Sequence, residues 1–152
     1  MNVIDQVVQK LWVARTLAAA RVIRPTRPDK LVGLLRALRR WGPTPAAGAT
    51  TGAIRSPDAT AIIDERGTLT FRDVHLRTNA ITHELCADGL GPGRTLAILC
   101  RNHRGFLEAT IAASKVGADV LYLNTAFAAP QLADVLARER PPALVHDEEF
   151  TA

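Results

Sequence analysis

Short apolar strands alternate with amphipathic helices through the second half of this sequence, and this order restricts the fold more than any other feature. A β-hairpin comes first, in which Asp64-Glu65-Arg66-Gly67 joins the two strands and the glycine supplies the unusual backbone angle. Strands that follow one another through helices pair in parallel by right-handed connections, so we predict an α/β fold with a hairpin and a βαβαβ sheet. The predicted strands cover residues 61–63, 68–71, 95–100, 120–123 and 143–145, and the predicted helices cover residues 74–85, 104–116 and a segment from about 130.

Basic residues are concentrated at the N-terminus of the 152-residue chain. Residues 1–41 hold nine Lys and Arg against two acidic residues, a net charge of +7, whereas residues 42–152 hold ten against thirteen, a net charge of −3. This asymmetry suggests an anionic partner, with membrane lipid or nucleic acid as the usual candidates. The basic segment lacks interleaved aromatic residues and a known nucleic-acid-binding fold, so we expect no nucleic-acid partner.

Two amphipathic helices are predicted in this basic arm, over residues 3–23 and 29–41, and Gly42-Pro43 ends the second. In the second helix, apolar side chains line one side and three arginines lie away from them. Such a helix lies in a membrane interface or packs on the protein's own domain, and the sequence leaves both possibilities open. The predicted membrane-surface residues are Leu31, Leu34, Leu35, Leu38, Trp41, Arg36, Arg39 and Arg40.

Residues 42–57, GPTPAAGATTGAIRSP, are rich in Gly, Pro, Ala and Thr and are predicted to be a linker between the arm and a domain over residues 58–152. The AGATTG run inside this segment has some likeness to a phosphate-binding loop. Such a loop needs a strand before it, a helix after it and usually a lysine, and none of these is evident here. We therefore expect no phosphate site in this segment.

No arrangement of residues in the sequence indicates catalysis or a metal site. Cys100-x-x-His103 is half of a metal-binding motif, and Cys100 ends an apolar strand, so core packing is expected for it. Neither Ser56 nor Ser114 lies in a nucleophile elbow, and the four histidines have no i, i+4 pairing. Asn102 is expected to cap the helix that follows it.

Three segments resemble the N-terminal region of AMP-forming acyl-CoA synthetases, members of the adenylate-forming ligase superfamily. In these enzymes Leu-Thr-Tyr/Phe opens one conserved block, and a Gly-Ala-hydrophobic stretch ending near Leu-Asn forms the next. The basic segment RPDKLVGLLRALRRWGPTP is similar to that of actinobacterial fatty-acid–CoA ligases. The resembling segments are LTFRDVHLRTNAITHEL (69–85), GLGPGRTLAILCRNHRGFLEATIAASKVGADVLYLNTAF (89–127) and QLADVLARE (131–139).

The resemblance implies the fold of the N-terminal part of the large domain, and a reaction that uses ATP, Mg²⁺ and coenzyme A. The family's phosphate loop, adenine-binding motif, ribose-binding aspartate and C-terminal lysine come after the resembling region. We therefore expect a truncated fragment that holds no cofactor and is inactive alone. In some family members a basic residue just before this Gly-Ala lies near the coenzyme A nucleotide, and Lys115 has the matching place. A role in neutralising the helix dipole is the alternative.

The alternative to a truncated ligase fragment is a binding module that associates with an anionic membrane through the basic arm. A second polypeptide that supplies the rest of a synthetase is a further expected partner. The N-terminal sequence MNVIDQ has no secretion signal, and no apolar stretch reaches the length of a membrane-spanning helix. We expect a cytoplasmic protein that is peripheral at the inner face of the membrane if the arm binds lipid.

Overall fold

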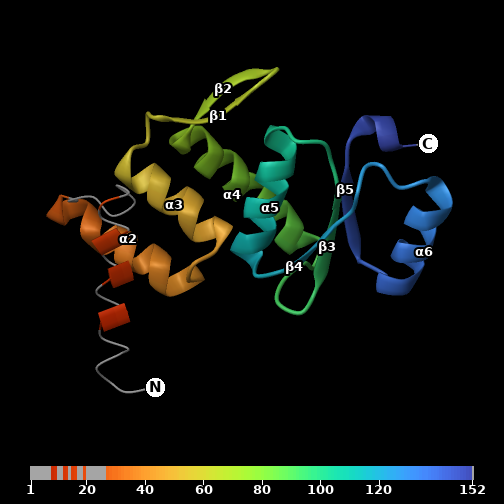
Figure 1. Ribbon diagram of the computed structural model, residues 1–152, viewed down its shortest axis with the longest axis horizontal. Coiled ribbons are helices and arrows are strands. Elements are labelled where there is room, and N and C mark those ends of the chain that lie inside the picture. Colours follow the sequence, from red (N-terminus) through yellow and green to blue (C-terminus); the bar gives the residue numbers. More distant parts are fainter. Residues whose placement is uncertain (1–7, 10–11, 14, 17–18, 20–26, 152) are drawn as a thin grey trace.

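The computed structural model describes residues 8–9, 12–13, 15–16, 19 and 27–151. Its elements run along an elongated molecule, with helices α2 and α3 at one end, α4 and α5 in the middle, and a parallel sheet with α6 at the other end (Figure 1). The β-hairpin projects beside α3 and α4 (Figure 1). The order of strands and helices from residue 60 onward confirms the α/β prediction.

The hairpin consists of β1 (Thr60–Asp64) and β2 (Gly67–Thr70), which pair antiparallel. Gly67 has a φ of 100°, a left-handed conformation that glycine adopts without strain. The Thr70 hydroxyl accepts a hydrogen bond from the Asp73 amide, and the Asp73 carboxylate accepts one from the Thr70 amide. This capping box starts α4 (Phe71–Ala87) directly after the hairpin.

Three parallel strands form the main sheet in the order β4-β3-β5. The central strand β3 is buried on both faces, as its continuous apolar sequence predicts. The side chains at its even-numbered positions, such as Leu96, pack with α4 and α5. Those at odd-numbered positions, such as Leu99, pack with α6 on the other face. The bounds are β3 Thr95–Leu99, α5 Arg104–Val116, β4 Asp119–Tyr122, α6 Ala129–Glu139, β5 Ala143–His146 and the 3₁₀ helix η1 Glu148–Phe150.

Residues 45–55 are a helix, α3 (Pro45–Arg55), so the prediction of a linker over residues 42–57 is wrong. Thr44 caps this helix and Pro45 occupies its first turn, where proline needs no amide partner. Three alanines that we interpreted as loop residues, Ala46, Ala47 and Ala49, are small side chains on the packed face of this helix, where they are buried. The AGATTG run therefore lies inside a helix and cannot cradle a phosphate.

Helix α2 (Pro28–Trp41) has the predicted length and ends at Gly42, yet only one of its predicted surface leucines is buried. Leu34 and Ala37 face the body of the molecule, and Gly33 lies next to Ile54 of α3. α2 contacts α3, and α3 contacts α4 and α5, so this helix belongs to the packed domain. The possibility that this helix packs on the protein's own domain is therefore confirmed for part of the predicted membrane face.

The helix predicted over residues 3–23 lies mostly outside the described residues. The positions described there, such as Val8, Trp12 and Thr16, are helical and exposed. None of the helices in the described part of the chain combines the length and hydrophobicity needed to cross a bilayer.

Candidate functional site

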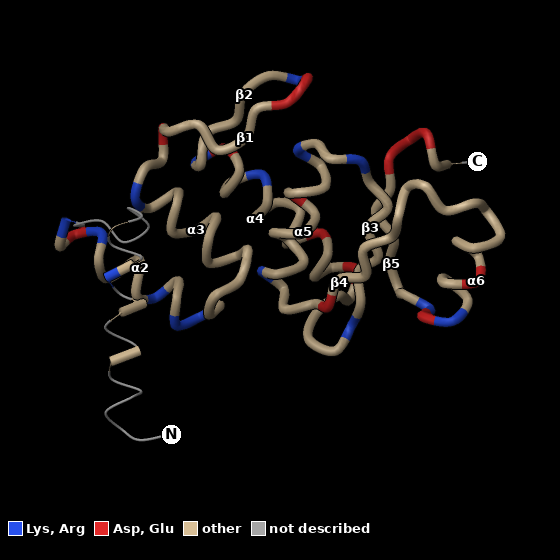
Figure 2. The backbone as a smooth tube through the Cα atoms, viewed as in Figure 1, with Lys and Arg blue, Asp and Glu red and all other residues tan. Residues whose placement is uncertain are grey.

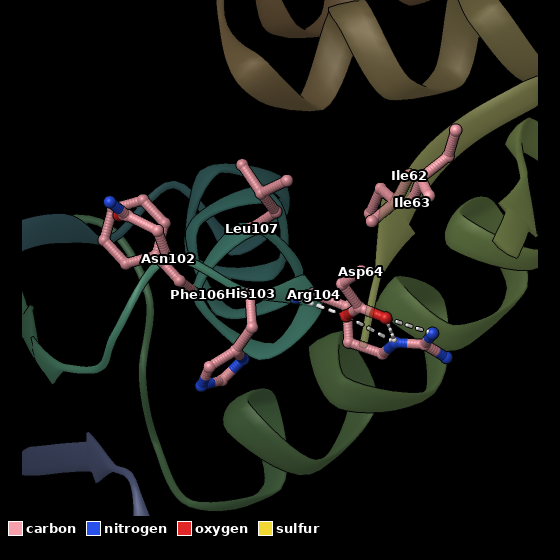
Figure 3. A pocket seen from close by; sticks show the side chains of 8 residues that line it. All are labelled: Ile62, Ile63, Asp64, Asn102, His103, Arg104, Phe106 and Leu107. Atoms are coloured by element: carbon pink, nitrogen blue, oxygen red, sulfur yellow. Dashed lines mark hydrogen bonds and ion pairs between the residues drawn. The ribbon is translucent and has the colours of Figure 1, made fainter. Parts of the chain in front are cut away.

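A groove lies between the β-hairpin and the start of α5, beside the carboxyl end of β3. Two adjoining pockets of about 210 Å³ and 300 Å³ form it and share four of their lining residues, which come from the hairpin and from the loop between β3 and α5. Figure 3 shows the larger apolar side chains around the first pocket. The lining residues of the two pockets are Ile62, Ile63, Asp64, Glu65, Arg66, Arg101, Asn102, His103, Arg104, Phe106 and Leu107.

An ion pair between Asp64 and Arg104 ties the hairpin to α5 across this groove (Figure 3). The Arg104 side chain donates to both carboxylate oxygens, with Nε at 2.8 Å from Oδ2, and its main-chain amide donates to Oδ2 at 3.1 Å. Arg104 also donates to the Gly67 carbonyl at the hairpin turn. These hydrogen bonds, led by those from the Arg104 side chain, hold the pKa of Asp64 well below its usual range. The ion pair therefore holds the hairpin and the start of α5 together where they line the groove.

His103 is the N-cap of α5 and also contacts the loop after β5. Its Nδ1 accepts a hydrogen bond from the Gly105 amide at 2.9 Å, and its Nε2 lies 2.7 Å from Oδ1 of Asp147. Because Nδ1 is the acceptor, Nε2 carries the proton and donates to Asp147. Asn102 was predicted to cap this helix, but it is exposed and its neighbour His103 has that role.

The loops after β3 and β5 leave the sheet toward opposite faces, and this is the type of position where open α/β sheets bind ligands. Here the two loops are joined to each other. The Asp147 carboxylate accepts from the Arg101 amide at 2.7 Å, and the Arg101 side chain pairs with Glu149. Burial raises the pKa of Asp147, but the hydrogen bonds from Arg101 and His103 outweigh it and the pKa is lowered. The carboxyl end of the sheet is thus held together by charged side chains.

The groove has the chemistry of a packing or binding surface, because Asp64 and Arg104 neutralise each other and Arg101 is paired with Glu149. Among the described residues, no group of three His, Cys, Asp or Glu is placed to hold a metal ion. Cys100 packs in the core as predicted, and burial raises the pKa of its thiol to about 11, so it is a poor nucleophile. Ile63 and Leu107 line the first pocket with exposed apolar side chains (Figure 3), whereas Ile62 packs in the core with Ala49 and Val74.

Lys115 lies in the interior, 8% exposed, although it was predicted at a solvated helix end or near coenzyme A. Its Nζ donates to Thr78 Oγ1 and to Asn79 Oδ1, each at 2.7 Å, and to the His75 carbonyl at 3.3 Å. Burial lowers the pKa of Lys115 to about 8. Burial also lowers the pKa of His75, and the charge of Lys115 adds to that shift. The amine joins α5 to α4, so contact with a nucleotide would require it to leave these partners.

The sequence reasoning missed the groove residues. A polar loop, Cys100-Arg-Asn-His-Arg104, directly after a buried parallel strand was the available signal, because such loops meet at the ligand-binding edge of a sheet. The partners Asp64 and Asp147 are distant in sequence from this loop and gave no local signal. Lys115, the one site residue predicted from the resemblance, lies at the opposite end of α5 from the hairpin ion pair.

Comparison with known proteins gives a family match over most of the chain. The family model described as "AMP-binding enzyme" matches residues 16–152. The chain belongs to the AMP-binding enzyme family. Within the family's N-terminal fold, the first resembling segment forms β2 and α4, and the second forms β3, α5 and β4. The hairpin, the parallel sheet and the order of its helices are those expected from the resemblance.

Relatives of this AMP-binding chain include ligases of several acids. A fatty acid–[acyl-carrier-protein] ligase, ScoC, of Streptomyces coeruleorubidus is 30% identical over 98 residues, which are 64% of this chain and 19% of that protein. A feruloyl-CoA synthase of an Amycolatopsis species is 33% identical over 94 residues, 62% of this chain and 19% of that protein. The chain therefore spans about a fifth of the length of these relatives.

A solved structure from Rhodopseudomonas palustris, described as a long-chain-fatty-acid CoA ligase, has a similar fold. The TM-score is 0.67 at 30% sequence identity, over 71% of this chain and 28% of that one. This likeness places the described domain in the N-terminal portion of the adenylate-forming ligase fold.

Proposed function

We propose that this chain is the N-terminal scaffold portion of an AMP-forming fatty-acid–CoA ligase. Such a ligase joins a fatty acid to ATP, releases pyrophosphate and passes the acyl group to coenzyme A. The family match and the likeness to the Rhodopseudomonas palustris protein support this choice. The free thiols Cys86 and Cys100 suit a reducing compartment, so we place the protein in the cytoplasm.

The observation that carries the proposal is the placement of the segment KVGADVLY. Gly117 ends α5 with a φ of 78° and turns the chain into β4, whose residues pair with β3 from Thr95 onward. Lys115 points inward and holds α5 on α4. The most distinctive family segment of this chain therefore builds the sheet and its covering helices, which is the work of a scaffold.

Adenylate formation needs donors aimed at the phosphates, a metal ion and a lysine at the reacting centre. By the resemblance, the family's residues for these tasks lie beyond residue 152. ATP, Mg²⁺ and coenzyme A are accordingly assigned to the complete ligase, and this chain is proposed to be inactive alone. A second polypeptide, or a continuation of the same reading frame, would supply the remaining parts.

Two observations test the proposal. The DNA downstream should encode a Thr/Ser/Gly-rich phosphate loop in one of its three frames. Co-expression of this chain with the polypeptide encoded there should give fatty-acid-dependent exchange of pyrophosphate into ATP. A downstream region with no such loop in any frame would contradict the proposal, and so would a completed protein that adenylates only substrates other than fatty acids.

A further inference from the structure

Helix α2 has a second apolar side that no described residue covers. Leu31, Leu35 and Leu38 are 47%, 58% and 51% exposed, and their spacing of four and three residues puts them on one strip of the helix. Leu34 and Ala37 lie on the neighbouring strip and are buried in the domain. The exposed strip is therefore separate from the packing face of the helix.

The same helix carries a cluster of positive charge. Arg36, Arg39 and Arg40 are exposed in its second half, and Figure 2 shows basic residues along α2 and at its end. Asp29 is the helix's one acidic residue, and it pairs with Arg27 at 3.3 Å. By the helical spacing, Arg39 borders the leucine strip, and Arg36 lies beside Arg39 on the side away from the leucines. The leucine strip and its basic border form one amphipathic surface.

The buried side of α2 holds this surface in a fixed position. Lys30 Nζ donates to the Arg55 carbonyl at 2.8 Å, and Trp41 Nε1 donates to the Lys115 carbonyl at 3.4 Å. The two contacts lie at opposite ends of the helix and join it to α3 and α5. The leucine strip is thus presented outward by a helix that is already folded, and binding would not have to supply the cost of forming it.

We propose that Leu31, Leu35 and Leu38, with Arg36 and Arg39, dock this protein on an anionic membrane surface. The leucines enter the boundary between headgroups and acyl chains, and the arginines reach the phosphates with their long side chains. An anionic bilayer suits this surface because α2 has no acidic residue after Asp29 that could pair with its arginines. Each basic residue near an anionic surface strengthens binding. The docking does not depend on the ligase assignment.

The structure also changes which residues make the contact. Leu34 and Trp41, which the sequence assigns to the membrane surface, are taken up by the domain. Arg40 lies over the Trp41 ring at 4.9 Å from its centroid, so it is nearer to the packed side than Arg36 and Arg39 are. Leu34→Gln should therefore destabilise the fold, whereas Leu35→Gln should leave it intact.

Vesicle sedimentation with the full chain tests the docking. Vesicles of phosphatidylcholine containing phosphatidylglycerol should bind the protein more tightly than vesicles of phosphatidylcholine alone, and added salt should weaken that binding. Leu35→Gln should lower the partition coefficient by about fivefold or more. Leu76→Gln is the matched control, because Leu76 is 59% exposed on α4, and it should bind like the native chain.

The charge contribution is tested in the same way. The pair Arg36→Gln and Arg39→Gln should lower binding to anionic vesicles by about 25-fold, from about fivefold for each arginine. The pair Arg94→Gln and Arg138→Gln removes equal charge elsewhere and should change binding by less than about twofold. Thermal melting monitored by circular dichroism checks that each variant is folded, and Leu38→Gln replaces Leu35→Gln if that variant is not.

Three results would overturn the proposal. The first is equal binding to neutral and anionic vesicles, and the second is native binding by folded Leu35→Gln and Leu38→Gln. The third is a dimer, detected by light scattering without lipid, that Leu35→Gln dissociates, because a second copy of the chain would then be the occupant of the strip.

Discussion

Gly52 of α3 lies directly against the ring of Phe71, the first residue of α4. A Cβ atom on Gly52 would stand 2.3 Å from Cδ1 of that ring, far inside van der Waals contact. The two helices approach this closely only because position 52 has no side chain. Gly52, the last residue of the AGATTG run, thus allows close helix packing. It does not belong to a phosphate-binding loop, which this run resembles in sequence.

Gly52→Ala is predicted to destabilise the protein by about 1–3 kcal/mol, because the added methyl group overpacks the contact with Phe71. Gly48→Ala is the matched control on the same helix. No atom lies within 4 Å of a Cβ at position 48, so alanine there should stabilise the protein by about 0.5–1 kcal/mol through its higher helix propensity. Urea denaturation measures both changes. Equal midpoints for the two variants would refute the packing role of Gly52.

Removal of the His103 side chain is predicted to cost about 1–2 kcal/mol of stability. His103→Ala removes the cap of α5 and the hydrogen bond to Asp147 together. His103→Asn should recover part of the loss, since asparagine is a good N-cap. His83→Ala, at an exposed position of α4, should change the free energy of unfolding by less than about 0.5 kcal/mol. Indistinguishable urea midpoints for the two alanine variants would contradict the capping role.

The charge of Lys115 is predicted to make stability rise with pH in the alkaline range. Burial lowers its pKa from 10.5 to about 8, so between these values the unfolded chain binds more protons than the folded chain. The free energy of unfolding therefore increases with pH across this window, by roughly 3 kcal/mol. The measurement is the difference in free energy of unfolding between the native chain and Lys115→Met, from pH 7.5 to 10.5. A difference that stays constant would mean that the amine is not buried in its charged form.

The Asp64 carboxylate is predicted to stabilise the docking of the hairpin at neutral pH and to lose this effect in acid. Its folded pKa lies below the ordinary 3.8, chiefly because the Arg104 side chain donates to it. The contribution is therefore complete above pH 3.8 and declines as the pH falls below that value. Asp64→Asn should lower stability at pH 7 and differ less from the native chain near pH 3. Asp58→Asn, at an exposed ion pair with Arg72, should show little effect at either pH.

Periodicity in the sequence was sufficient for most of the second half of the fold. The continuous apolar run of β3, the glycine that ends α5 and the turn at Gly67 have physical meanings that do not depend on distant residues. The predicted strands agree with the structure to within one residue at each end, whereas the helix predicted over residues 74–85 begins three residues after the start of α4. The same local logic failed at α3, because glycine and alanine are typical of loops and also of closely packed helices.

Features made by distant residues were not predictable in this way. Arg104 and Asp64 are 40 positions apart, and the partners of Lys115 lie at least 36 positions before it. On α2, the amphipathic pattern shows that a side is apolar but does not say whether the domain or another surface covers it. Leu34 and Leu35 are adjacent in sequence, yet Leu34 is buried in the domain and Leu35 is exposed. The sequence alone does not distinguish them.

The central proposal is that this chain is a scaffold portion of a ligase and does not form acyl adenylates by itself. The most direct test is exchange of radiolabelled pyrophosphate into ATP by the purified chain, with Mg²⁺ and fatty acids of several lengths. Loss of a single oriented donor commonly costs on the order of 10²–10³ in rate. Because the resemblance assigns the family's donors to positions beyond residue 152, we predict no exchange by residues 1–152 above a no-enzyme control. Fatty-acid-dependent exchange that disappears in Thr50→Ala, Thr51→Ala or Lys115→Met would contradict the account.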